Sequence, residues 1–469
     1  MRILGLTTLF VSLALSLFGQ SDRGTITGTV IDPANAVVPG ATVAVTHRET
    51  GGQYQTATTS TGNYTLPSLP VGTYDLSVQV TGFKQFIQKG ITVAVAQTVR
   101  LDVVLQVGTN TESVTITADA DLLKTENAEQ SFVTTNDRLD QLPLPALYVR
   151  NPLNWASQVP GVVGNVNGPA GSSTIRVNGS PATTYKVLVD GQDITSSIDP
   201  SHTLEQQPSV EALQEFALES SNFAAEFGQV QGGLFNFTSK SGSNQVHGSA
   251  YSYFRNEDLN AATPFTHLRP KLRAFDWGGT VGGPVYIPKV YDGRNKTFFF
   301  VNWEKYQTLG NASSFISLPT AAMRAGDFSS LLTGKQLGTD IAGNPIMQNA
   351  IYDPTTAHLV NGQTVTNPFP GNIIPANRLN ATALKIQALF PLPTLNQPLN
   401  NFAQTCATPD NRTLPSFKID QNFGTRSKLS FYWSGYDYES FGRNDCLPQP
   451  ISVETTRSIP THTYRLAYD

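Results

Sequence analysis

The sequence has few charged residues, two cysteines and no long apolar segment in its interior. Asp, Glu, Lys and Arg make up 14% of its 469 residues, against about 25% in an ordinary soluble protein. The net charge is −4 and no basic block is present, which argues against a nucleic-acid-binding protein. No interior run approaches the roughly 18 apolar residues of a membrane-spanning helix.

Motifs for catalysis and metal binding are also missing. The six histidines are scattered and show no H-E-x-x-H spacing. Neither a G-x-S-x-G motif nor a P-loop is present. Pairs such as Glu257 and Asp258 are most simply solvated charges of loops. We therefore expect no enzyme activity, no catalytic residue, no metal site and no cofactor.

Glycine, proline, tyrosine and phenylalanine are frequent, and the chain is long enough for two to four domains. An aromatic, charge-poor chain of this kind fits a secreted β protein or an outer-membrane barrel. Residues 1–20 begin with Arg2, continue with an apolar run and end near Gly19 and Gln20, which is typical of a Sec signal peptide. Export would place the two cysteines in an oxidising compartment, where they can pair.

Residues 24–107 alternate apolar and polar positions between Pro and Gly turns, which predicts a small β-sandwich. The segment resembles the carboxypeptidase regulatory-like domain, a prealbumin-like β-sandwich. The matching residues are Gly28, Val30, Asp32, Pro39, Gly40, Ala41, Val43, Gly62, Tyr64, Leu66, Pro67, Leu69, Gly72, Tyr74, Leu76, Val78, Gly82 and Phe83. They are turn and core positions and imply a fold without an activity. His47 is the only histidine of this segment, so no metal site is expected there. Some relatives of this sandwich bind carbohydrate.

Residues 215–261 carry the most specific pattern in the chain, a series of glycines and polar residues at fixed spacing. The pattern resembles the end of the plug and the first barrel strand of TonB-dependent outer-membrane receptors, particularly the Oar-like group. The matching residues are Asn222, Ala225, Glu226, Gly228, Gly232, Gly233, Asn236, Lys240, Ser241, Gly242, Asn244, His247 and Gly248, then Arg255, Asn256, Leu259, Asn260 and Ala261.

Residues 125–245 predict a mixed α/β unit, which the same resemblance identifies as the plug. Two strands end in turns at Asn178-Gly179 and Asp190-Gly191, and helical spacing predicts a helix over residues 208–218. The plug motif, interpreted as structural, consists of Arg176, Asn178, Gly179, Asp190, Gly191, Gly232 and Gly233. On this interpretation Asp190 needs no role beyond a tight turn.

Residues 108–124 form a polar linker between sandwich and plug. Within it Val114 and Ile116 alternate with hydroxyl residues, and such an extended segment can add itself to a partner sheet. It resembles a TonB box, the segment that pairs with the periplasmic energy-coupling protein in this receptor family. A last strand of the sandwich would show the same pattern. The candidate residues are Glu112, Ser113, Val114, Thr115, Ile116, Thr117 and Ala118.

Residues 246–469 contain about six segments with one apolar and one polar face, as expected for strands between lipid and lumen. A soluble sandwich gives the same alternation, and the plug motif with the signal peptide favours a barrel. The predicted fold is therefore mainly β, with a sandwich, a mixed α/β plug and the first strands of an antiparallel transmembrane β-barrel. Because such barrels close with roughly 22 strands, we expect this chain to be the truncated front part of a receptor.

The strand directions implied by this resemblance place Cys406 before one strand and Cys446 after its neighbour, both on the outer side. A disulfide between them is a hypothesis that follows.

The predicted function is TonB-dependent transport, as energised uptake or export of an unidentified substrate across the outer membrane. The expected partners are a TonB-type periplasmic energy-coupling protein and outer-membrane lipid. Two alternatives stay open: an outer-membrane binding or adhesion protein with a carbohydrate-binding-like sandwich and no transport, and a nonfunctional receptor fragment.

Overall fold

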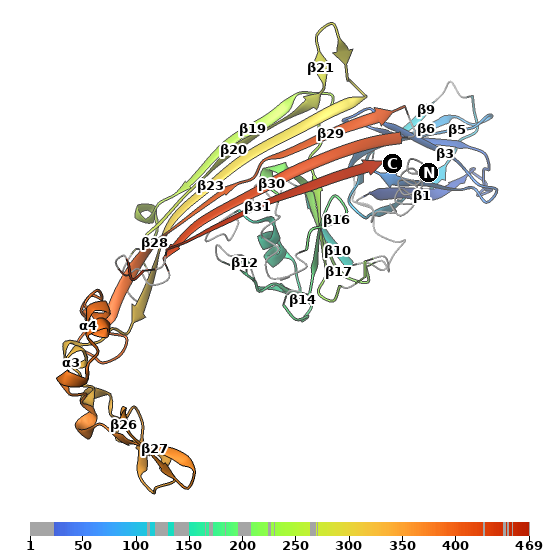
Figure 1. The fold of residues 1–469 in the computed structure, drawn as a ribbon. Coiled ribbons are helices and arrows are strands. Elements are labelled where there is room, and N and C mark those ends of the chain that lie inside the picture. Colours follow the sequence, from blue (N-terminus) through green and yellow to red (C-terminus); the bar gives the residue numbers. More distant parts are fainter. Residues whose placement is uncertain are drawn as a thin grey trace, which may run out of the picture.

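The computed structural model shows a small two-sheet unit, then a mixed sheet, then a wide curved sheet of long strands (Figure 1). The described residues are 23–109, 113–117, 130–135, 150–164, 166–167, 172–182, 184–195, 208–223, 227–228, 230–262, 269, 271–424, 427–443, 447, 450–452 and 454–468. The expected signal peptide, residues 1–20, lies outside them. Within these ranges, no helix is long and apolar enough to span a membrane.

The first unit is the predicted β-sandwich, in which alternate residues of each strand point inward. The inward side chains, among them Ile26, Tyr64 and Leu76, form one buried core. One sheet contains β4 (Asn63–Leu69), β1 (Gly24–Ile31), β7 (Thr98–Arg100) and β8 (Val103–Val104). The other contains, in spatial order, β3 (Gln53–Ala57), β2 (Thr42–His47), β5 (Gly72–Gln79), β6 (Gln85–Val93) and β9 (Ser113–Thr117).

A five-stranded mixed sheet follows, here called the plug sheet. Its strands in spatial order are β10 (Gln130–Thr135), β17 (Leu213–Ser221), β18 (Leu234–Ser239), β15 (Lys186–Val189) and β16 (Gln192–Asp193). Beside it lie a 3-10 helix, η1 (Pro152–Gln158), and the pairs β11 (Val162–Val163) with β14 (Arg176–Val177) and β12 (Val166–Asn167) with β13 (Ser172–Ser173). The plug core contains Trp155, Phe216, Phe235 and Phe237.

The helix predicted over residues 208–218 is wrong. Only a 3-10 turn, η3 (Val210–Ala212), forms there, and β17 begins at Leu213. Because β17 lies between β10 and β18 and is buried on both faces over most of its length, its apolar residues do not alternate with polar ones. The spacing of Leu213, Phe216 and Ala217 therefore imitates that of a helix.

The third unit is an antiparallel sheet of long strands, here called the wall. Its strands in spatial order are β19 (His247–Arg255), β20 (Leu272–Pro284), β23 (Thr297–Ile316), β28 (Phe402–Thr413) with β29 (Ser416–Phe423), β30 (Ser427–Arg443) and β31 (Glu454–Tyr468). β28 and β29 both pair with β23 on one side and β30 on the other. They form one span interrupted at Leu414 and Pro415, where proline lacks the N–H needed for a regular ladder.

The two faces of the wall differ in chemistry. On the outer face Trp277 and Trp303 are 37–38% exposed and their rings lie 4.6 Å apart. On the inner face the intervening residues Asp276, Asn302 and Glu304 are at most 3% exposed. A face of aromatic residues opposite a face of polar ones is the pattern of a barrel strand between lipid and lumen.

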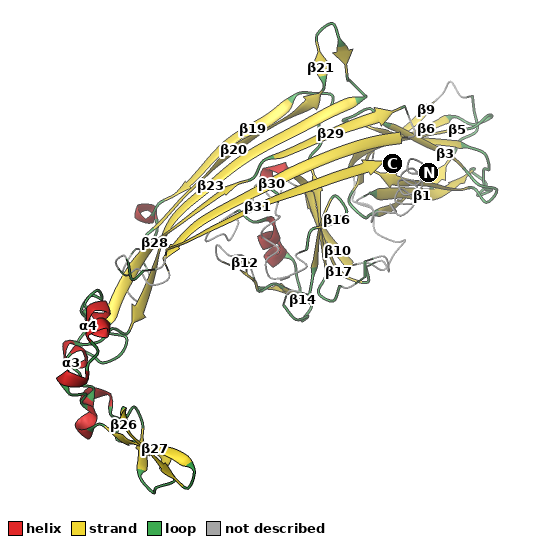
Figure 2. Cartoon of the chain, viewed as in Figure 1, coloured by secondary structure: helices red, strands yellow, loops and turns green. Residues whose placement is uncertain are grey.

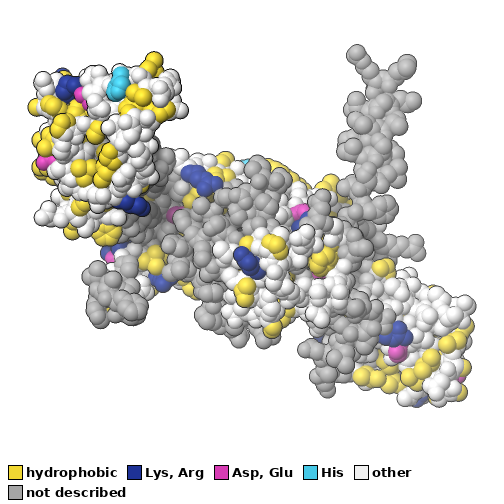
Figure 3. All heavy atoms as spheres, turned by 90° about the horizontal axis from the view of Figure 1, so that it is seen from below, with side chains coloured by type: hydrophobic (Ala, Val, Ile, Leu, Met, Phe, Trp, Pro, Cys, Tyr) yellow, Lys and Arg dark blue, Asp and Glu magenta, His cyan; other side chains and the backbone are white. Residues whose placement is uncertain are grey.

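The two ends of the wall also differ (Figure 2). Near the sandwich, β21 (Tyr286–Ile287) and β22 (Tyr291–Asp292) form a hairpin between β20 and β23. At the opposite end, residues 317–401 form a lobe. It contains α3 (Ala321–Arg324), α4 (Ala381–Gln387), and the hairpins β24 (Gln336–Thr339) with β25 (Pro345–Met347) and β26 (Tyr352–Val360) with β27 (Gln363–Pro368). From below, this lobe shows groups of hydrophobic side chains and few charged ones, at the left of Figure 3.

Candidate functional site

The carboxylate of Asp190 lies at the centre of a buried polar contact between the plug sheet and the wall. Asp190 follows β15 and starts the turn to β16, with positive φ at both Asp190 and Gly191. Its side chain is fully buried. The next strand, β18, ends at Ser239, whose backbone N–H and side-chain Oγ both donate to the carboxylate, at 2.8 and 2.5 Å. Asp190 therefore ties the ends of two plug strands together.

Two cations of the wall complete this contact, here called the Asp190 cluster. Lys418 on β29 places Nζ 3.4 Å from the Asp190 carboxylate and 2.9 Å from Ser239 Oγ. Arg465 on β31 lies 3.7 Å from the same carboxylate. Burial by itself would raise the pKa of Asp190, but Lys418, Arg465 and the hydrogen bonds from Ser239 outweigh it and hold the pKa below its usual value. The carboxylate is therefore ionised at neutral pH.

The register of the wall explains how these cations meet. Lys418 pairs with Tyr432, and Tyr432 pairs with Arg465, so the three residues form a row across β29, β30 and β31. Tyr432 packs against the plug core. The row therefore places one positive charge on each side of Tyr432, the residue that contacts the plug.

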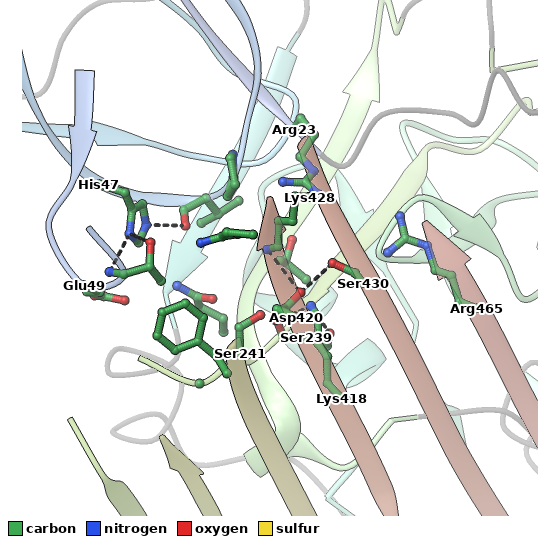
Figure 4. A pocket seen from close by; sticks show the side chains of 18 of the residues that line it. Arg23, His47, Glu49, Ser239, Ser241, Lys418, Asp420, Lys428, Ser430 and Arg465 are labelled. Carbon is green, nitrogen blue, oxygen red and sulfur yellow. Dashed lines mark hydrogen bonds and ion pairs between the residues drawn. The ribbon is translucent and has the colours of Figure 1, made fainter. Parts of the chain in front are cut away.

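A polar cavity of about 60 Å³ adjoins the Asp190 cluster. On its wall side, Lys428 lies 3.1 Å from Asp420, which also accepts a hydrogen bond from Ser430. Its opposite side is formed by His47 and Glu49 of the sandwich (Figure 4). The cavity thus lies where sandwich, plug sheet and wall meet.

A second buried contact, here called the Arg150 cluster, has the opposite polarity. Arg150 of the plug lies 2.9 Å from Glu211 of η3 and 2.8 Å from Asp276 of β20. Its guanidinium lies over the rings of Tyr251 and Tyr253 of β19, 4.7 and 4.6 Å from their centroids, within cation–π distance. Burial by itself would lower the pKa of Arg150, but the surrounding carboxylates outweigh it and raise the pKa.

Glu304 of β23 extends the Arg150 cluster. It is 1% exposed and accepts a short hydrogen bond from Ser209, the residue before η3. In this cluster the wall supplies the carboxylates of Asp276 and Glu304, and the plug supplies the cation Arg150 together with its own carboxylate, Glu211. The two clusters can hold the plug sheet on the wall, and both must open if the plug moves away.

The predicted plug motif lies where tight backbone geometry is required. Asn178 and Gly179 have φ of 50° and 77° and form the turn after β14, a conformation that Asn and Gly tolerate; Arg176 on β14 is exposed. Gly233 has φ of 97°, and a Cβ on Gly232 would lie 2.7 Å from Thr184 Oγ1. These residues shape the plug and are separate from the two ionic clusters, apart from Asp190 and its neighbour Gly191.

The candidate TonB box lies at the edge of the sandwich. Ser113–Thr117 forms β9, which pairs in parallel with β6. This is the position of a last sandwich strand, the alternative that the sequence left open. Glu112 and Ala118 lie outside the described residues, and the assignment as a TonB box stays a prediction.

The disulfide hypothesis also stays a prediction. Cys406 belongs to β28, where its Cα is paired with that of Ala312 on β23. Cys446 lies outside the described residues.

Sequence reasoning missed most of the charged residues that join plug and wall. Lys418, Asp276 and Glu304 were assigned only to the polar face of wall strands, and Arg150 and Arg465 received no role. The charges themselves are a signal that could have found these residues. A charge on the inner face of a strand that is otherwise apolar or neutral is costly unless it is paired, so each indicates a partner of opposite charge. The local sequence around each of these charges does not indicate its partner.

Comparison with known families assigns both ends of the chain. The profile of the carboxypeptidase regulatory-like domain matches residues 25–106, and that of an outer membrane beta barrel domain matches residues 238–469. The TonB-dependent transporter Oar of Myxococcus xanthus is 27% identical over 314 residues, which cover 62% of this chain and 28% of that protein. The chain thus spans less than a third of the length of this curated relative.

Solved receptor structures show similarity at a low level. The siderophore receptor PirA of Acinetobacter baumannii is 15% identical, with 72% of this chain and 44% of that chain covered and a TM-score of 0.33. The outer-membrane transporter YddB of Escherichia coli is 11% identical, with 72% and 36% covered and a TM-score of 0.39. The chain therefore combines a carboxypeptidase regulatory-like domain with an outer membrane beta barrel domain and is similar in sequence to a TonB-dependent outer-membrane transporter.

Proposed function

We propose that this protein transports a substrate across the outer membrane, driven by a TonB-type periplasmic protein. The observation that supports this most is the docking of the plug sheet on the inner face of the wall through the Asp190 and Arg150 clusters. A plug held by buried ion pairs occupies the lumen in a defined position. Leaving that position costs free energy, because buried charges lose their partners, and an outside agent can supply this energy.

The segment proposed to receive this work is residues 112–118. It precedes the plug strand β10, so a pull on it is transmitted along the backbone toward the plug. Its extended conformation in β9 suits pairing with a strand of another protein. Export through the Sec signal peptide at residues 1–20, with delivery to the outer membrane, is part of the same proposal.

A proline pair tests the proposed coupling segment. Val114→Pro with Ile116→Pro removes two backbone N–H groups and should prevent strand pairing. The matched control is Gln53→Pro with Gln55→Pro on β3, the opposite edge of the same sheet. The measurement is the Kd of the full chain in detergent micelles for the purified C-terminal domain of TonB from the same bacterium.

We expect the Val114/Ile116 pair to bind at least about ten-fold more weakly than the control pair, or about 1.4 kcal/mol. Equal affinities of the two pairs would refute the assignment of this segment. Circular dichroism of both variants checks that the sandwich still folds.

A further inference from the structure

The strand β9 is attached to the sandwich along one edge only. Its five residues pair in parallel with β6, from Gln85 with Ser113 to Lys89 with Thr117. In the spatial order of that sheet β9 comes last, and within the described residues no other strand pairs with it.

The sandwich core closes without β9. The buried core includes Phe86 of β6 but ends along the chain at Leu105, eight residues before β9 begins. The chain after the core is fixed by backbone hydrogen bonds from Lys84 N–H to Gln106 O and from Gly108 N–H to Gly82 O. Loss of β9 would therefore expose an edge of β6 and leave the core intact.

The apolar side chains of β9 face the same side of the sheet as the core residue Phe86. Val114 pairs with Phe86 and is half-buried, while Ile116, two residues on, is 46% exposed. A partner strand that recognises the segment through alternate side chains must contact this face of it. While β9 is docked, Val114 is turned toward the sandwich and is only partly accessible.

We propose that the sandwich is a reversible holder of the coupling segment: β6 and the strand of the TonB-type partner compete for Ser113–Thr117. This inference rests on the function proposed above and adds a regulatory role for the sandwich. In the docked state the segment is withheld, and the partner's apparent affinity is reduced by the docked fraction. Because none of the described side chains of β9, those of residues 113–116, belongs to the buried core, release needs no unfolding of the sandwich.

A disulfide that locks β9 on β6 tests the competition. The variant carries Ile87→Cys and Thr115→Cys, which are paired across the two strands, together with Cys406→Ser and Cys446→Ser so that only the new thiols can react. Val114 and Ile116 stay unchanged. The matched control locks two strands of the other sheet through Thr27→Cys and Thr65→Cys, which are also paired, in the same background.

The measurement compares the oxidised and reduced forms of each full-length variant for binding to the C-terminal domain of TonB. We expect oxidation to weaken binding of the Ile87/Thr115 variant at least ten-fold, with recovery on reduction, and to leave the control unchanged. Equal binding by both forms of the Ile87/Thr115 variant would overturn the proposal, because the partner would then use the outer edge of β9 or another segment.

The two proposals fail in different ways. If the Val114/Ile116 proline pair still binds TonB normally, the coupling segment is wrongly assigned and both proposals fall. If the proline pair loses binding while the locked variant keeps it, the coupling segment stands and only the competition with β6 is wrong.

Discussion

Replacing Asp190 by asparagine tests how strongly the plug sheet is held on the wall. Asparagine keeps the shape of the side chain and tolerates the positive φ of 48° at this position, so the substitution removes the charge without straining the turn. Lys418, with a side chain 8% exposed, then loses its carboxylate partner. Arg465, at 17%, keeps more contact with water.

The magnitude follows from the geometry. At 3.4 Å the attraction between Lys418 and Asp190 is about 5 kcal/mol for an effective dielectric constant of about 20. Desolvation of both groups offsets part of this in the native protein, but the variant removes the carboxylate that pairs with the desolvated lysine and leaves it Ser239 and the charge of Asp420. Removing one partner of a buried pair costs about 3–5 kcal/mol. We expect a loss at the lower end, about 3 kcal/mol, because Ser239 still accepts from Lys418.

Tryptophan provides the assay. Of the four tryptophans, Trp155 belongs to the plug core, whereas Trp277, Trp303 and Trp433 belong to wall strands. Labelling with 5-fluorotryptophan lets ¹⁹F NMR follow plug and wall separately during urea unfolding in micelles. A loss of about 3 kcal/mol lowers the midpoint of the Trp155 transition by roughly 1–3 M urea. An unchanged Trp155 midpoint would refute the ionic attachment of the plug.

The same cluster predicts a pH dependence. Because the pKa of Asp190 is lower in the folded protein than in the unfolded chain, its contribution is present above the unfolded value, near 3.9, and is lost as the pH falls through the folded value. Wild type should therefore lose plug stability below about pH 4 by more than the Asp190→Asn variant does. Equal acid sensitivity of the two proteins would show that the carboxylate is not stabilised by its neighbours.

Two further substitutions test the plug–wall junction, with the same NMR assay in micelles, and the outer face of the wall, by urea unfolding in lipid vesicles. Gly242→Ala should destabilise the plug–wall junction by about 1–3 kcal/mol, because its Cβ would lie 2.4 Å from Phe299 O and 2.6 Å from Gly283 O. In the control Gly228→Ala the new Cβ meets no atom of the described residues within 4 Å. Equal stability of the two variants would argue against this close approach. Trp303→Arg should destabilise the wall in lipid vesicles by up to about 2–4 kcal/mol. The control Leu359→Arg in the lobe, at a side chain already 73% exposed, should have little effect. A tolerated arginine at position 303 would show that this face does not contact lipid.

The wall strands could be predicted because their two faces differ in chemistry, and the pattern of residues 215–261 together with the signal peptide favoured a barrel over a soluble sandwich. In β29, for example, Lys418 and Asp420 are buried on the inner face while Phe417 and Ile419 lie on the other. β17 was mistaken for a helix because a strand covered on both faces has no such contrast. Local periodicity is informative only where the two faces of a strand contact different environments, one polar and one apolar.

The partners in the ionic clusters could not be predicted from local sequence. Lys418 and Asp190 are 228 positions apart in the sequence. Asp190 stands in a Val-Asp-Gly turn, where an aspartate is expected from turn geometry alone, without a charge partner. A buried positive charge such as that of Lys418 is costly unless an anion faces it. Which anion does so depends on the order of strands in two separate sheets.

The opposite polarity of the two clusters fixes the orientation of the plug sheet on the wall. Lys418 pairs with Phe300 of β23, and Glu304 lies four residues further along that strand, about 13 Å away at 3.3 Å per residue. Where the wall offers cations the plug presents Asp190, and where it offers carboxylates the plug presents Arg150. A plug docked the other way round would bury like charges against each other, which costs several kcal/mol. The ion pairs therefore select one docked arrangement, whatever their net contribution to stability.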